Sequence, residues 1–268
     1  MAKHHLPIGV FDSGMGGLTV LRAMREALPY ESFIYLGDTA RLPYGTKSPE
    51  TVKQYAVQMA KVLVERNIKV LVVACNTATT AALPHLQSML PDIPVLGVVA
   101  PGAKAAVAAS KNHHIAVLAT ETTIAAKAYH NLIKASLPKA SIKSQACALL
   151  VALAEEGMVD NEIARSTLKH YLKGFKDEDT YVLGCTHFPV FKPLLATLLP
   201  ASAQIVDSAE ETAKALKQLL TETNLTNGTQ PKSPMKYLVT DSCKRFQTVG
   251  ELFLGHPIDK HHIQLVDV

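Results

Sequence analysis

Short apolar runs alternate with longer segments of helical spacing along most of the chain. The runs are rich in β-branched residues and predict strands at 8–11, 33–37, 70–74, 95–99, 115–119, 142–146, 181–184, 204–206 and 236–240. The segments between many of them predict helices at 17–27, 49–66, 77–90, 102–109, 122–136, 161–173, 189–199 and 209–220. This alternation indicates an α/β fold with right-handed crossovers and mainly parallel sheets covered on both faces.

One short sequence pattern occurs twice along the chain. Val-Val-Ala-Cys-Asn-Thr at 72–77 and Val-Leu-Gly-Cys-Thr-His at 182–187 both run from apolar strand residues through a small residue and a cysteine to polar residues before a helix. The two cysteines lie 110 residues apart, about one α/β domain. We therefore expect two similar α/β domains facing each other across an active-site cleft, one formed by 1–97 plus 208–268 and the other by 98–207.

Composition excludes several classes of protein. The 268 residues are 48% apolar and 19% charged, so the chain is expected to fold over most of its length. The 27 Lys and Arg and 23 Asp and Glu are dispersed, which argues against a nucleic-acid surface and is compatible with a small anionic ligand. The longest apolar runs, 69–80 and 93–109, are interrupted and shorter than the roughly 20 residues of a membrane span. Without a recognisable secretory signal, we expect a cytoplasmic protein.

The cysteines carry the first chemical hypothesis. Cys75, Cys147, Cys185 and Cys243 form no C-x-x-C pair, so each is expected to be a free thiol, whose ordinary role is that of a small buried hydrophobe. Cys75 and Cys185 differ because each lies between a strand and a helix, where unpaired N–H groups would stabilise a thiolate and lower the pKa. Two facing thiols could remove a proton from one face of a carbon and return one to the other, which inverts a stereocentre.

The first strand ends in Asp-Ser-Gly-Met-Gly-Gly at 12–17. A dinucleotide fingerprint is excluded because its third glycine would fall on Thr19, and no P-loop is present. Asp12 has two interpretations. It either caps the following helix or points into the site, where it could bind an ammonium group or assist a thiol.

The second strand leads into Gly-Asp-Thr-Ala-Arg-Leu-Pro-Tyr-Gly at 37–45. This loop suits a backbone wall against a small ligand, although a surface turn held by Arg41 and Asp38 is the alternative. A second polar, turn-rich stretch at 221–234 is expected to be a mobile surface loop.

Polar residues that follow the two cysteines could bind carboxylate groups. Asn76 and Thr77 follow one thiol, and Thr186 and His187 follow the other. Cys-x-His is a weak metal signal without further ligands at usable spacing, so no metal site is predicted and a proton-relay or orienting role for His187 is favoured. The histidine pairs at 4–5, 113–114 and 261–262 are expected on the solvated surface.

Four motifs together resemble those of the cofactor-independent glutamate racemases of bacterial peptidoglycan synthesis. They are Phe-Asp-Ser-Gly at 11–14, Gly-Asp-Thr-Ala-Arg with Pro-Tyr-Gly at 37–45, Ala-Cys-Asn-Thr at 74–77 and Gly-Cys-Thr-His at 184–187. The resemblance runs from about residue 8 to 255. Aspartate racemases share the two-cysteine plan, and the Pro-Tyr-Gly loop and His187 favour the glutamate branch.

The resemblance implies roles for individual residues. Cys75 would take the α-proton of D-glutamate and Cys185 that of L-glutamate, with Asp12 assisting Cys75, and His187 and Glu155 assisting around Cys185. The substrate-binding residues implied in this way are Asp12, Ser13, Pro43, Tyr44, Gly45, Asn76, Thr77, Thr120, Thr123, Thr186 and His187. The family often has proline in the segment leading to the glutamate, whereas 147–152 has none.

The resemblance also implies the biological setting. It indicates an enzyme without metal or pyridoxal phosphate, a homodimer, and D-glutamate supply for peptidoglycan synthesis, with no nucleic-acid or membrane partner. Two other functions stay open: an aspartate or broad-specificity amino-acid racemase with the same thiols, and a binding module for amino acids or small anions without turnover.

Overall fold

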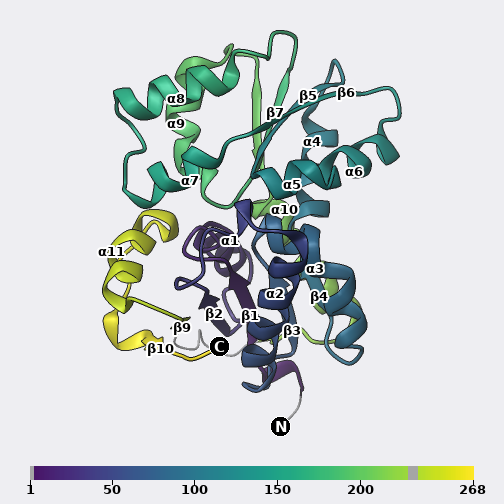
Figure 1. Ribbon diagram of the computed structural model, residues 1–268. Helices are drawn as coiled ribbons and strands as arrows, with labels where there is room; N and C mark the ends of the chain where they lie inside the picture. The colour runs from purple at the N-terminus through teal and green to yellow at the C-terminus, as the bar shows by residue number, and fades with distance from the viewer. Residues whose placement is uncertain (1–2, 229–234) are drawn as a thin grey trace.

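The computed structural model describes residues 3–228 and 235–268, which form two parallel sheets with surrounding helices (Figure 1). The strands are β1 (Ile8–Asp12), β2 (Phe33–Gly37), β3 (Val70–Val73), β4 (Val95–Gly97), β5 (His114–Ala119), β6 (Ser141–Ala146), β7 (Thr180–Gly184), β8 (Gln204–Asp207), β9 (Lys236–Val239) and β10 (Ile263–Leu265). The first sheet has the order β10-β9-β2-β1-β3-β4 and the second β6-β5-β7-β8. Every strand pair within the described residues is parallel, so the predicted fold class is confirmed.

Helices surround both sheets. They are α1 (Leu18–Ala27), α2 (Pro49–Val64), α3 (Asn76–Met89), α4 (Val99–Ala109), α5 (Glu121–Ala125), α6 (Ala128–Ser136), α7 (Ala148–Glu155), α8 (Glu162–Leu172), α9 (Lys192–Leu198), α10 (Ala209–Glu222) and α11 (Cys243–Leu254). Short 3-10 helices are η1 (Lys3–His5), η2 (Tyr44–Thr46), η3 (Phe188–Phe191) and η4 (Lys260–His262). Within the described residues no helix is both long and apolar enough to cross a membrane.

Burial explains why the strands were readable from the sequence. Every residue of β1, β2, β3 and β7 is buried, as expected for parallel strands covered on both faces, and such strands read as continuous apolar runs. The edge strand β6 is polar and partly exposed instead. All nine predicted strands are present, with ends shifted by at most two residues.

The two sheets share an internal plan. The order β2-β1-β3-β4 within the first sheet matches β6-β5-β7-β8 in the second. Cys75 follows β3 and Cys185 follows β7, so the two cysteines occupy equivalent positions in this plan. Strands β9 and β10 return to the first sheet, which agrees with the strand content of the two predicted domains, while the domain boundaries themselves stay a prediction.

Two predicted helices are interrupted. The helix expected at 122–136 is divided into α5 and α6, because Lys127 adopts a left-handed conformation with φ 53°. The helix expected at 189–199 begins as η3 and becomes α-helical only at Lys192. In both places a local backbone change divides one apolar pattern into two elements.

Two α-helices and one strand of the described residues were not predicted. The helix α7 lies in the apolar run Ala-Leu-Leu-Val-Ala-Leu-Ala, which has no helical periodicity to recognise. The helix α11 and the short edge strand β10 were treated as part of an undivided segment after β9. The C-terminal return therefore consists of a strand, a helix and a second strand.

The stretch 221–234, expected to be a mobile surface loop, starts inside α10. Beyond that helix the chain is anchored: the Leu225 carbonyl accepts from Lys69 Nζ at 2.8 Å, and the Asn227 amide donates to Glu31 Oε1 at 2.7 Å. Lys69 and Glu31 form a buried ion pair beneath it. The expectation was therefore wrong for the first part of the stretch, and its residues 229–234 lie outside those described.

Candidate active site

Cys75 caps the N-terminus of α3. Its Sγ accepts from the Ala78 amide at 3.4 Å and lies 3.7 Å from Ser13 Oγ, and the residue is 4% exposed. Burial raises the pKa of the Cys75 thiol to about 12, with the Asp12 charge adding to the effect, although the Ala78 and Ser13 hydrogen bonds act in the opposite direction. The predicted fall in pKa is thus wrong for Cys75, because the cost of desolvating a thiolate exceeds the stabilisation by the helix start.

Cys185 begins a chain of three side chains. Its Sγ lies 3.9 Å from His187 Nδ1, and His187 Nε2 lies 2.9 Å from Glu155 Oε1. Burial lowers the pKa of His187, but the interactions with Cys185 and Glu155 outweigh burial and raise that pKa to about 10. The imidazole is therefore protonated at neutral pH and lies between a carboxylate and a thiol.

Asp12 connects the ends of β1 and β7. Its Oδ2 accepts from the amides of Gly14 and Gly17, and its Oδ1 accepts from Thr186 Oγ1 at 3.3 Å. The side chain is completely buried. One oxygen of Asp12 therefore holds the start of α1, as the capping interpretation expects, and the other contacts a residue beside Cys185. Binding of an ammonium group or assistance to a thiol stays a prediction.

Three predicted binding threonines meet across the two sheets. Thr77 Oγ1 lies 2.9 Å from Thr120 Oγ1 and 3.5 Å from Thr123 Oγ1, and the latter two are 3.0 Å apart. All three are buried. The residues that follow β3 and β5 thus form one hydroxyl cluster beside Cys75.

Asn76 has a buried group without a partner. Its Oδ1 accepts from Tyr129 OH at 2.7 Å, whereas its Nδ2 has no hydrogen-bond partner among the described residues. Asn76 and Tyr129 are each 2% exposed. A buried unpaired amide donor costs about 1–3 kcal/mol, so a donor held in this way points to an absent acceptor such as a ligand carboxylate.

The loop after β2 is held from two directions. Tyr44 OH and Arg41 Nε both donate to Asp38 Oδ2, and Thr240 Oγ1 donates to Asp38 Oδ1. The backbone carbonyl of Gly45 accepts from Thr122 Oγ1 at 3.1 Å, which joins the loop to α5. The loop therefore includes the Arg41–Asp38 turn that was the alternative interpretation, and it also contacts the helix α5 that follows β5.

The structure brings most of the predicted site residues into this region. Direct contacts connect Asp12 to Thr186, Ser13 to Cys75, Thr77 to Thr120 and Thr123, and Cys185 through His187 to Glu155. Tyr44 and Gly45 lie in η2, directly after Pro43, and Gly45 approaches Thr120 so closely that a Cβ would lie 2.5 Å from the threonine Cβ. Among residues 3–228 and 235–268, no group of three or more His, Cys, Asp or Glu side chains could hold a metal ion.

Sequence reasoning missed several residues that support the site. Three of them lie in helices whose sequence gives no sign of their contacts with the site. They are Tyr129, which contacts Asn76, Thr122, which contacts Gly45, and Arg245, which contacts Glu155. Tyr35 OH donates to the Gly14 carbonyl at 3.0 Å from inside β2, where an apolar strand pattern hides it. Asp38 lies in the loop 37–45 that the sequence pointed to as a wall of the site. Only the neighbouring Arg41 and Tyr44 hinted that its side chain would be buried.

The histidine pairs behave as predicted. His5, His113, His261 and His262 are exposed, and His4 and His114 are partly exposed.

Cys147 is a buried thiol whose Sγ donates to the Gln145 carbonyl at 3.4 Å, and burial raises its pKa to about 12. It therefore has the ordinary structural role of a free cysteine.

Known proteins match the chain over nearly its whole length. Residues 8–216 match the model of a family described as Asp/Glu/Hydantoin racemase. A glutamate racemase of Geobacter metallireducens is 48% identical over 250 residues, 92% of each chain. A glutamate racemase isoform from Bacillus anthracis has a crystal structure that superposes with a TM-score of 0.93 at 36% identity, covering 99% of this chain and 98% of the other. The glutamate racemase of Francisella tularensis, solved with D-glutamate, superposes with a TM-score of 0.90 at 37% identity, covering 98% of each chain.

Proposed function

Because the chain belongs to the Asp/Glu/Hydantoin racemase family, we propose that it interconverts L-glutamate and D-glutamate with Cys75 and Cys185 as paired acid and base. The observation that carries this proposal is the equivalent placement of the two thiols. Each follows the third strand of the shared order, and their neighbours Thr186 and Asp12 contact each other. An amino acid bound between the thiols would have one on each side of its α-carbon.

The surroundings of the two thiols differ. Burial and the Asp12 charge raise the pKa of Cys75, which favours the thiol and therefore proton donation. A protonated His187 beside Cys185 can donate a hydrogen bond to a thiolate, which favours proton removal. This arrangement is ready for the reaction from L- to D-glutamate.

The proton balance requires one proton between the two cysteines, with Cys75 starting as the thiol and Cys185 as the thiolate. The Cys185 thiolate takes the α-proton of L-glutamate, and Cys75 gives its proton to the opposite face of the carbanion. Turnover leaves Cys185 as a thiol and Cys75 as a thiolate, and proton exchange with solvent restores the starting state. The reverse reaction uses the same two groups with their roles exchanged.

The carbanion intermediate needs stabilisation from the polar residues around it. In this proposal Asn76 Nδ2 and the hydroxyls of Thr77 and Thr186 bind a carboxylate, and Asp12 binds the substrate ammonium group. The support is that Asn76 Nδ2 has no partner among the described residues and that Thr186 contacts Asp12. These side chains are buried, so they act in a low-dielectric environment where hydrogen bonds to charge are strong. Binding of this kind supports proton removal at a carbon that is otherwise a weak acid.

Glutamate is favoured over aspartate as the substrate by the relatives. The curated relatives at 41–48% identity are named glutamate racemase, and one similar crystal structure contains D-glutamate. The Pro-Tyr-Gly loop at 43–45 and His187, which favour the glutamate branch, are present beside the site. An aspartate or broad-specificity racemase is the second candidate.

The wider role follows from the same family. We propose that the enzyme is a cytoplasmic homodimer that works without metal or pyridoxal phosphate and supplies D-glutamate for peptidoglycan synthesis. The support is the resemblance across the whole chain and the named relatives. Sedimentation of the purified protein tests the dimer directly.

The activity is tested with purified protein and L- or D-glutamate in deuterated water, under reducing conditions and without added cofactor. Loss of the α-proton NMR signal and decay of optical rotation are followed together. Exchange with racemisation supports the proposal, and the same assay with aspartate measures the preference. Saturable binding of glutamate without exchange would favour a binding module instead.

A further inference from the structure

The C-terminal helix α11 contacts both members of the His187–Glu155 pair. Arg245 Nη2 lies 2.9 Å from Glu156 Oε1, 3.4 Å from the Glu155 carbonyl and 4.0 Å from Glu155 Oε2. Phe253, from the same helix, packs edge-on against the His187 ring with centroids 5.2 Å apart. Figure 1 shows α11, in yellow, beside β9 and next to α7.

The two oxygens of the Glu155 carboxylate face different partners. Oε1 accepts from His187, and Oε2 lies nearest to the Arg245 guanidinium. The Glu155 side chain is 9% exposed, so an unpaired oxygen there would lose much of its hydration. Arg245 therefore places a cation 4.0 Å from the second oxygen and donates to the Glu155 carbonyl at the end of α7, while its closest ion pair is with Glu156.

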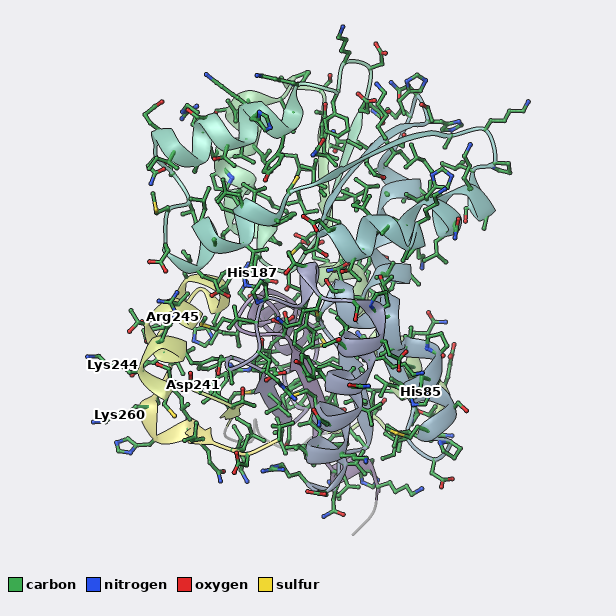
Figure 2. The ribbon with its side chains drawn as sticks, viewed as in Figure 1. His85, His187, Asp241, Lys244, Arg245 and Lys260 are labelled. Atoms are coloured by element: carbon green, nitrogen blue, oxygen red, sulfur yellow. The ribbon has the colours of Figure 1, made fainter. Side chains whose placement is uncertain are left out.

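The same C-terminal segment also holds the loop after β2. Thr240 Oγ1 donates to Asp38 Oδ1, and the Asp241 amide donates to Thr39 Oγ1 at 2.8 Å. Residues 240–245 thus connect the loop that carries Tyr44 with the carboxylate behind His187. Figure 2 shows Arg245 on α11, with Lys244 directed away from the protein on the outer side of the same helix.

We propose that Arg245 is a positioning residue for the half of the reaction that uses Cys185, acting through Glu155 on the orientation of His187. This inference rests on the proposed racemase function. Arg245 lies too far along the chain of contacts to touch the substrate: Glu155 and His187 stand between it and Cys185. Its loss would leave His187 hydrogen-bonded to a carboxylate whose other oxygen has lost its nearby cation and whose backbone carbonyl has lost a donor.

The proposal predicts a change in kcat more than in KM. The Arg245 side chain is 47% exposed, and half-exposed ion pairs contribute modestly, so Arg245→Gln is expected to lower kcat by a factor of about three to ten, with KM changed less than about twofold. Arg245→Lys keeps the charge but not the planar fork and should recover part of the loss. Lys244→Gln removes the same charge from the neighbouring position and should behave as wild type.

The experiment measures racemisation of L- and D-glutamate by wild type, these three variants, Glu155→Gln and the double variant Arg245→Gln with Glu155→Gln. If Arg245 acts through Glu155, its substitution causes no further loss in the Glu155→Gln background. A kcat for Arg245→Gln equal to that of wild type would overturn the proposal. An equal fold loss in both backgrounds would do so too.

Melting curves ensure that each variant is assayed well below its unfolding temperature. Because Arg245 is half-exposed, its substitution is expected to change the melting temperature little. If wild type racemises glutamate and Arg245→Gln is unaffected, only this inference fails. If wild type does not racemise glutamate, the proposed function fails and this inference fails with it.

Discussion

The substitution Tyr129→Phe tests whether the buried amide of Asn76 is a substrate-binding group. It removes one hydroxyl, which donates to Asn76 Oδ1 at 2.7 Å, and keeps the ring in place. The lost hydrogen bond is replaced by a buried carbonyl without a partner, since Tyr129 and Asn76 are each 2% exposed. The cost of leaving such a group unsatisfied is about 1–3 kcal/mol, and we expect the free energy of unfolding to fall by that amount.

The effect on activity follows from the orientation of the amide. With Oδ1 held by Tyr129, Nδ2 stays directed away from that contact and available to a ligand. If the misoriented amide weakens binding of the transition state by about 1 kcal/mol, kcat/KM falls about fivefold. Because the equilibrium constant of a racemisation is one, kcat/KM must fall equally for L- and D-glutamate.

The assay combines urea unfolding with racemisation kinetics followed by polarimetry. Tyr181→Phe is the matched control, because Tyr181 is 3% exposed and its hydroxyl makes no hydrogen bond to the described residues. We expect the control to stay close to wild type in both measurements. A Tyr129→Phe enzyme as stable and as active as wild type would refute the role assigned to this contact.

Three further changes test other parts of the site. Cys75→Ala and Cys185→Ala should each abolish racemisation and leave the melting temperature nearly unchanged, and normal two-way turnover by either variant would exclude the paired-thiol mechanism. The pKa of His187 is raised to about 10, so its contribution to stability is complete below about pH 6.5 and is lost as the pH rises towards 10. Urea unfolding across this window should show a decline that is reduced in His187→Gln, and equal declines in both proteins would contradict the assignment. Gly45→Ala would place a Cβ 2.5 Å from a threonine side chain across the site and should raise KM and cost about 1–3 kcal/mol in unfolding free energy, whereas Gly174→Ala, with open space around it, should do neither.

The central strands of the sheets were predictable because they are buried on both faces. A run such as Val-Leu-Val-Val in β3 is apolar at every position, and the polar residues at its end mark where it stops. The repeated pattern around Cys75 and Cys185 then located the two thiols at equivalent strand ends. This information is local, so it can be read without knowing how the chain folds.

Contacts between distant segments could not be read in this way. Tyr129 lies 53 residues from Asn76, and Arg245 lies 90 residues from Glu155, so neither pair leaves a pattern in the sequence. The pKa of Cys75 is a related case: the helix start was visible, but the burial that dominates the shift arises only when the chain has folded. The same holds for α7, whose uniformly apolar sequence carries no periodic signal.

The central claim is that two different groups handle the proton on opposite faces of the α-carbon. The isotopic composition of both enantiomers at low conversion, starting from protonated L-glutamate in deuterated water, tests this most directly. Two thiols predict D-glutamate carrying deuterium at the α-carbon while the remaining L-glutamate stays protonated, because Cys75 supplies a solvent-derived deuteron and Cys185 holds the proton it removed. D-glutamate that retains the original proton would show a single base acting on both faces and would contradict the account.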